Sequence, residues 1–180
     1  MSYNGKLKGA HLSNVDQVIY EDYSNSAFKK FIGKWPRQAS RGIVRFSNGD
    51  ILIFVKEKNN QYKLPGGGKE GNETPEETFI REVHEETGYK IKNISKVGIT
   101  KGYTQISHIF IAEPDGKPET PHLDKDEAKR GAKCIRIKPE EAIAHMEAFI
   151  NARKNSTDDD SLIQYHLTLR DLEIIRFTQE

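Results

Sequence analysis

Glutamates are concentrated in one short stretch of this 180-residue chain: of its 27 acidic residues, seven are glutamates between positions 70 and 86. At 100° per residue along an α-helix, Glu82, Glu85 and Glu86 project from one side. The neighbouring stripe is apolar and consists of Phe79, Ile80, Val83 and Thr87. Only Arg81 lies close enough to offset the three like charges, so we expect a further cation, and clustered oxygen ligands suit Mg²⁺, Mn²⁺ or Ca²⁺.

Three consecutive glycines, 66–68, directly precede this stretch. Glycine permits backbone conformations with positive φ and lets a ligand approach the main chain closely. Backbone carbonyls of such a loop can add to the ligands of a metal ion. A glycine-rich loop that leads into a carboxylate-bearing helix is therefore a stronger signal than either feature alone.

The segment GGKEGNETPEETFIREVHEETGY, residues 67–89, resembles the signature of the Nudix hydrolases, also called MutT-like proteins. The positions that match the family pattern are Gly67, Glu73, Arg81, Glu82, Val83, Glu85, Glu86 and Gly88. Tyr89 departs from the pattern, because an aliphatic residue is usual there, but that position packs rather than reacts. The strand and helix pattern around the motif is similar to the family over about residues 38–152.

The resemblance implies an α+β fold, an α/β/α sandwich around a mixed β-sheet. It implies hydrolysis of a nucleoside diphosphate linked to another moiety, with Mg²⁺ or Mn²⁺ as cofactor and a small-molecule nucleotide diphosphate as substrate. Divalent ions can clamp diphosphate oxygens and make bound water a better nucleophile.

The resemblance also implies roles for individual residues. Glu82, Glu85, Glu86 and the carbonyl of Gly66 become metal ligands, and the glycine backbone at 66–67 lies against the substrate. Glu73 and Arg81 become a supporting pair. The general base in this family is a glutamate of the motif or an acid from a later loop, and we favour Glu127. The alternative for Glu127 is a solvated loop acid.

Six basic residues and no acid occur between residues 23 and 49: Lys29, Lys30, Lys34, Arg37, Arg41 and Arg45. They could bind the phosphates of the substrate or an RNA 5′ end, or they could be solvated surface residues. Arg41, just before an apolar run, is the best candidate for phosphate binding. Trp35 could stack on a base, although a core position is the commoner outcome for tryptophan.

Local signals predict the elements that must position these residues. A Thr-x-x-Glu capping box at Thr74, with Gly88 as the stop, predicts a helix over about 75–87. The other predicted helices are 24–35, one from Pro139 onward, and about 161–176. The predicted strands are 15–20, 42–46 and 51–56 joined as a hairpin through 47–50, 62–65, 91–99, 105–111 and 132–137. The segment 113–131 is expected to be a long surface loop.

These elements give three segments: an N-terminal arm over 1–37, a Nudix domain over 38–152 and a C-terminal helix over 153–180 packed on the same domain. The net charge of +1 and the single Cys134 exclude a strongly basic nucleic-acid binder and an intrachain disulfide. No stretch resembles a signal peptide or a membrane span. We therefore expect a cytoplasmic protein, and a homodimer remains one of the open assembly states.

Two other function classes compete with an enzyme: a non-catalytic Nudix-fold sensor that binds a nucleotide or sugar, and a structural cation-binding domain. The presence of all three motif glutamates favours catalysis. The substrate stays open, because the positions 15 to 18 residues after the motif hold neither the Pro nor the Tyr of some subfamilies. Neither ADP-ribose nor a dinucleoside polyphosphate is indicated by this feature.

Overall fold

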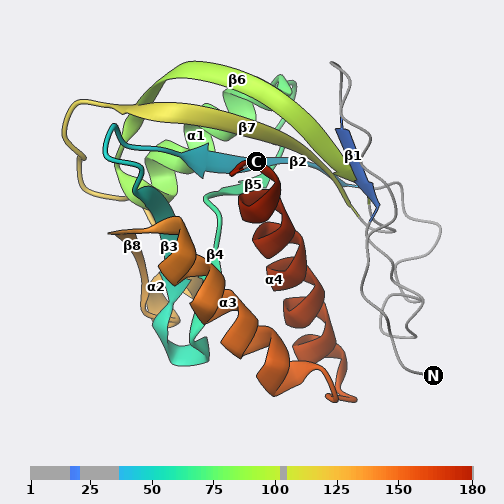
Figure 1. Cartoon of the computed structure of the whole chain (residues 1–180). Coiled ribbons are helices and arrows are strands. Elements are labelled where there is room, and N and C mark those ends of the chain that lie inside the picture. Colours follow the sequence, from blue (N-terminus) through green and yellow to red (C-terminus); the bar gives the residue numbers. More distant parts are fainter. Residues whose placement is uncertain (1–16, 21–36, 102–104, 180) are drawn as a thin grey trace.

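The computed structural model describes residues 17–20, 37–101 and 105–179, and shows two β-sheets with helices on either side (Figure 1). The larger sheet has the order β1 (Gln17–Tyr20), β6 (Lys90–Lys101), β7 (Gln105–Asp115), β2 (Arg37–Val44) and β5 (Gly66–Gly68). The smaller sheet has the order β4 (Gln61–Lys63), β3 (Ile51–Lys56) and β8 (Ala132–Ile137). β1 with β6 and β2 with β7 are parallel and the other pairs are antiparallel, so the larger sheet is mixed, as predicted.

The helices are α1 (Pro75–Thr87), α2 (Lys125–Lys129), α3 (Pro139–Arg153) and α4 (Asp159–Phe177), with a 3₁₀ turn at Glu57–Asn59. α1 has the predicted bounds: Thr74 and Glu77 form both bonds of the capping box, and Gly88 ends the helix with a φ of 75°. At the start of α4, the Asp158 carboxylate accepts a hydrogen bond from the Ser161 amide. These caps satisfy backbone groups that the helix ends would leave unpaired.

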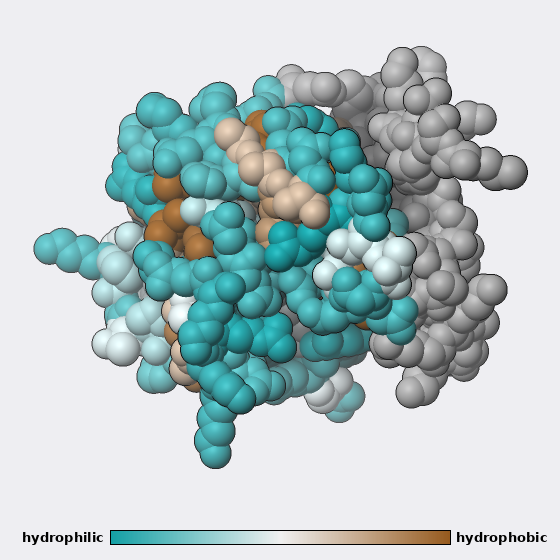
Figure 2. Space-filling view, turned by 90° about the horizontal axis from the view of Figure 1, so that it is seen from below, coloured by the Kyte–Doolittle hydropathy of each residue, from teal (hydrophilic) through white to brown (hydrophobic). Residues whose placement is uncertain are grey.

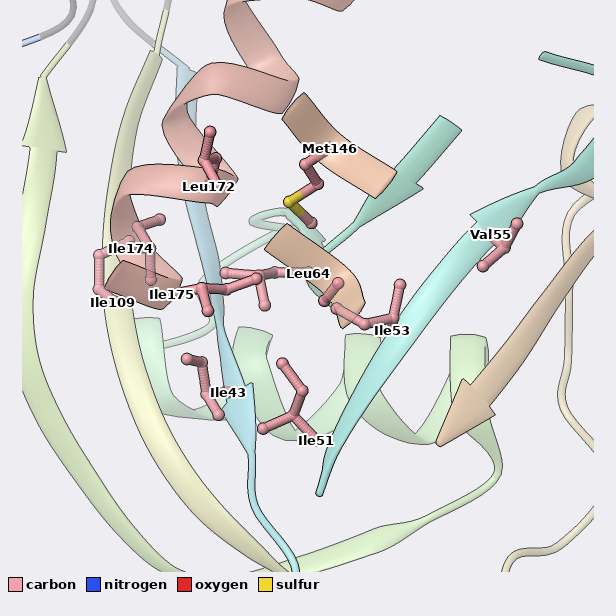
Figure 3. Packing of buried hydrophobic residues seen from close by; sticks show 11 residues of the cluster. Ile43, Ile51, Ile53, Val55, Leu64, Ile109, Met146, Leu172, Ile174 and Ile175 are labelled. Atoms are coloured by element: carbon pink, nitrogen blue, oxygen red, sulfur yellow. The ribbon is translucent and has the colours of Figure 1, made fainter. Parts of the chain in front are cut away.

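The alternation of side chains along the central strands sends apolar residues to two separate layers. On one face, Val44 of β2 and Leu52 of β3 pack with Phe79 and Val83 of α1. On the other face, Ile43 and the odd-numbered residues of β3 pack with Met146 of α3 and with Leu172, Ile174 and Ile175 of α4 (Figure 3). The predicted α/β/α arrangement follows, with α1 on one side and α3 and α4 on the other.

Several predictions need correction or fall outside the described residues. The runs at 42–46 and 51–56 do not form a hairpin: the turn exists, but after the bridge between Arg45 and Ile51 the strands enter different sheets. β2 pairs with β5 and β7, whereas β3 pairs with β4 and β8, so other strands occupy both hydrogen-bonding edges of each and leave no edge for a β2–β3 ladder. The segment 113–131 contains the end of β7 and α2. The predicted helix at 24–35 and Trp35 lie outside the described residues.

The apolar stripe of α1 is narrower than predicted. Phe79 and Val83 are fully buried, but Ile80 is 39% exposed. Figure 2 shows one face of the molecule, which is largely hydrophilic with small separate apolar areas. Within the described part of the chain, no helix is both long enough and apolar enough to cross a bilayer.

Candidate active site

The three motif glutamates of α1 face a cavity of about 440 Å³. Residues of β2, β4, β5, β7, α1, α4 and the segment before β8 line this cavity. Its acidic lining residues are Glu70, Glu82, Glu85, Glu86, Asp124 and Glu127, and its basic ones are Arg37, Arg41, Lys63, Lys69, Arg81 and Arg170. The backbone of Gly66–Gly68 also lines it, so the glycine run and the carboxylate face meet in one place.

Glu86 is the most deeply buried of the three glutamates, with 4% of its surface exposed. The Gly66 amide donates a hydrogen bond to its Oε2 at 2.8 Å, which fixes α1 against β5. Burial raises the pKa of Glu86 to about 7, although Lys63 and the Gly66 amide oppose the shift. A buried carboxylate beside other acids is unfavourable when ionised unless a cation accompanies it.

Glu82 and Glu85 both contact one guanidinium. Arg81 Nη1 donates to Glu82 Oε1 at 3.0 Å and to Glu85 Oε2 at 2.9 Å. Burial raises the pKa of Glu82, and Arg81 opposes that shift. One cation therefore serves two carboxylates, which leaves this face with excess negative charge.

Arg81 also holds the loop before α1. Its Nε donates to Glu73 Oε1 at 2.7 Å and its Nη2 to Glu73 Oε2 at 3.2 Å, which is a bidentate pair. A further bond from Nη2 reaches the Gly68 carbonyl at 2.9 Å. The hydrogen bond from Arg81 lowers the pKa of Glu73 to about 2. Arg81 and Glu73 pair as the resemblance implies, whereas Glu77, four residues before Arg81, accepts a hydrogen bond from the Thr74 amide and caps the helix instead.

Four oxygen donors in this cavity could hold a divalent cation: the carboxylates of Glu82, Glu85 and Glu86 and the Gly66 carbonyl. Among residues 17–20, 37–101 and 105–179, no three acidic, imidazole or thiol groups are arranged to bind one metal ion. Arg81 donates hydrogen bonds to Glu82 and Glu85, and the Gly66 amide donates one to Glu86. The donor types nevertheless suit Mg²⁺. The absence of a side chain at Gly67 leaves room for one of these donors, because a methyl group there would overlap the Glu82 carboxylate.

Comparison with known proteins places the chain in a family. Residues 36–159 match the model of the NUDIX domain. The chain belongs to the NUDIX family. Its relatives include an ADP-ribose pyrophosphatase of Bacillus subtilis, 42% identical over 137 residues that cover 69% of each chain. A MutT-like protein of Streptomyces ambofaciens is 35% identical over 80 residues, 43% of this chain and 52% of that one.

An RNA pyrophosphohydrolase of Acinetobacter baylyi is 32% identical over 78 residues, 42% of this NUDIX chain and 46% of the relative. The chain thus spans about half the length of several relatives that it matches. Among solved structures, a putative nudix hydrolase family member from Chromobacterium violaceum is 17% identical, with a TM-score of 0.47, over 82% of this chain and 98% of that one.

The cavity of this NUDIX protein also contains Glu127, the candidate general base, and Arg41, the candidate phosphate-binding residue. Glu127 is half-buried there, and the Asp124 amide donates to its Oε2 at 3.3 Å. Arg41 is buried, with its Nη1 3.4 Å from Asp171 Oδ1 of α4. Arg45 does not line the cavity, and its Nη2 donates to the Thr178 carbonyl at the end of α4. Of the basic stretch, Lys29, Lys30 and Lys34 lie outside the described residues.

Sequence reasoning did not single out several lining residues, among them Lys63, Leu167 and Arg170. Arg37 belongs to the basic stretch predicted to bind phosphates, and it lies four residues before Arg41 on β2, so the two share one face of the strand. Arg170 had no such signal: it belongs to α4, which begins at Asp159, where the NUDIX match ends.

Proposed function

We propose that this protein is a Mg²⁺- or Mn²⁺-dependent diphosphohydrolase that cleaves the diphosphate of a nucleoside diphosphate linked to another group. The observation that carries the proposal is the charge distribution in the cavity. Carboxylates of α1 and basic side chains of β2, β4 and α4 line the same cavity. A diphosphate bound there could contact both a metal ion held by the carboxylates and the basic side chains.

In this proposal Glu82, Glu85, Glu86 and the Gly66 carbonyl hold the metal ion, which would offset charge on the diphosphate and lower the pKa of a bound water. The chain's own contribution is positioning. The Glu73–Arg81 pair keeps the loop against α1, and the Gly66 amide orients Glu86. Glu127, which has one carboxylate oxygen free of the Asp124 bond, is our candidate to accept the proton of the attacking water.

Similar proteins suggest which compound to test first. Two of these proteins, from Bacillus subtilis and Methanocaldococcus jannaschii, are ADP-ribose pyrophosphatases, so ADP-ribose comes first in the panel that we propose. The others are nucleotide sugars, dinucleoside polyphosphates, nucleoside triphosphates including 8-oxo-dGTP, and capped or triphosphorylated RNA. Each is incubated with Mg²⁺ and the products are identified by mass. Binding without product from every compound would favour the alternative, a nucleotide-binding sensor.

We expect chelation to stop the reaction. EDTA in excess should abolish turnover, and added Mg²⁺ or Mn²⁺ should restore it, because the one guanidinium that pairs with Glu82 and Glu85 in the described part of the chain cannot balance three carboxylates. The measurement is the rate of product release on the best substrate of the panel before chelation, after it and after repletion. Full turnover in metal-free buffer would contradict the assignment of a metal site to α1.

Gly67→Ala is expected to lower turnover by roughly tenfold or more while leaving the fold intact. The three atoms nearest to the added methyl group all belong to the carboxylate end of the flexible Glu82 side chain, so the carboxylate is expected to move rather than the backbone. Gly66→Ala is the matched comparison: Gly66 has a φ of 140°, and a methyl group there would overlap the backbone of Ser40 and Arg41. That variant should lose thermal stability. Native turnover of Gly67→Ala would show that the position of Glu82 is not critical.

A further inference from the structure

α4 brings an arginine into the cavity from outside the region that matches the NUDIX model. Leu167 and Arg170, three residues apart on one face of α4, both line the cavity. Two buried contacts fix the helix there. Gln61 donates to the Thr168 hydroxyl at 3.3 Å, and the Leu64 amide donates to Asp171 Oδ2 at 3.0 Å. The position of Arg170 is therefore set by the core of the protein rather than by a surface loop.

Only part of the Arg170 guanidinium has a protein partner. Its Nε and Nη2 each lie 2.9 Å from Asp171 Oδ1. Its Nη1 is buried and has no hydrogen-bond partner among the described residues, and the side chain is only 1% exposed. A buried donor without an acceptor is costly, and such groups in native proteins call for a ligand, a water molecule or an ion.

The charges around Asp171 point to an anion. Asp171 is fully buried and is shared by two guanidinium groups, those of Arg41 and Arg170. Burial alone would raise the pKa of Asp171, but Arg170 and Arg41 hold it below its usual value, so the carboxylate is ionised at neutral pH. Two positive charges and one negative charge leave an excess of one positive charge, and Lys63 adds another at the same cavity.

We propose that Arg170 is a substrate-binding residue whose Nη1 donates to a phosphate oxygen of the substrate, with Asp171 as the residue that positions it. This inference rests on the proposed function, because it takes the ligand to be a nucleotide diphosphate. The competing explanation is that Arg170 serves only to neutralise Asp171 inside the fold. The two explanations differ in whether loss of Arg170 changes affinity for the phosphate group itself.

The test uses inorganic pyrophosphate, the group common to all candidate substrates, and calorimetric titration in the presence of Mg²⁺. Arg170→Gln is expected to raise the Kd for pyrophosphate by about 10- to 100-fold, the range for loss of a hydrogen bond from a charged group. Arg176→Gln is the control: Arg176 is an exposed arginine of the same helix that pairs with Glu147 and Glu173 and does not line the cavity. It should bind pyrophosphate as the wild type does.

Arg170→Lys guards against a folding defect, because it keeps a positive charge beside Asp171 but cannot reproduce the guanidinium fork. It should fold and still bind pyrophosphate about tenfold more weakly than the wild type. Wild-type affinity in Arg170→Lys or in folded Arg170→Gln would overturn the inference, and so would a wild-type protein that fails to bind pyrophosphate at millimolar concentration. Because binding is measured without turnover, absence of hydrolysis across the substrate panel would refute the proposed function and leave this result standing.

Discussion

Glu86→Gln should lower turnover at least about a hundredfold while the protein stays folded. Glu86 is the buried glutamate of the three, and its charge is the one most poorly solvated without a metal ion. Glutamine keeps the size of the side chain, and its carbonyl oxygen can still accept the hydrogen bond from the Gly66 amide. What is lost is the negative charge, and loss of charge on a metal ligand removes much of its hold on the cation.

The same substitution should stabilise the metal-free protein, because it removes a buried negative charge that lies near two other carboxylates, those of Glu82 and Glu127. Turnover with Mg²⁺ and the melting temperature in EDTA are the two measurements. Glu76→Gln is the control, since Glu76 is an exposed glutamate in the first turn of the same helix. Near-native turnover of Glu86→Gln would mean that Glu86 only anchors β5 to α1.

The parts of the fold that depend on local chemistry could be predicted from the sequence. α1 has its predicted bounds because Thr74, Pro75 and Gly88 specify its ends through the backbone groups next to them. β8 also has its predicted bounds, and the predicted apolar stripe of α3 contains Met146 and Phe149, which are buried. The spacing of Glu82, Glu85 and Glu86 along a helix was enough to predict that they share one face, and all three line the same cavity.

Strand pairing could not be predicted in the same way. The Asn48-Gly49 turn is present, with Gly49 at a φ of 87°, but the partners of β2 and β3 come from segments far along the chain. A turn signal specifies the reversal of the chain and not the sheet that each strand joins. Ile80 shows the same limit on α1: it lies at the border of the apolar stripe and is 39% exposed.

The basic residues of the cavity had no common sequence signal because they come from separate elements: Arg41 belongs to a basic stretch, whereas Lys63 and Arg170 do not. Arg41, Lys63 and Arg170 are more than 20 residues apart from one another, and their proximity depends on the packing of α4 against β4. The charge pattern of the chain is nearly balanced, so no local excess marks Arg170. Only the buried carboxylate of Asp171, which gathers two guanidinium groups, shows why these residues meet.

The pair formed by Arg81 and Glu73 should matter far more than an exposed ion pair. The Arg81 guanidinium donates hydrogen bonds to three parts of the protein: Glu73 in the loop, the Gly68 carbonyl of β5 and the carboxylates of α1. Arg81→Ala should therefore lower both turnover and apparent Mg²⁺ affinity by roughly tenfold to a hundredfold, the range seen when groups that orient metal ligands are removed. Arg81→Lys should also be poor, because an ammonium group cannot make the bidentate pair with Glu73.

A double-mutant cycle separates this positioning role from independent effects. Glu73→Gln should resemble Arg81→Ala, and the combined variant should be little worse than either one, which corresponds to a coupling free energy of about 1 to 3 kcal/mol. Rates are measured as a function of Mg²⁺ concentration for the four proteins of the cycle.

The comparison cycle uses Arg136 and Asp50, which do not line the cavity and whose Nε and Oδ2 atoms lie 2.9 Å apart. That surface pair should couple by only about 0.2 to 1 kcal/mol in stability and leave turnover unchanged. Additive losses at Arg81 and Glu73 would mean that the two residues act separately, and that the loop is held against α1 by other contacts.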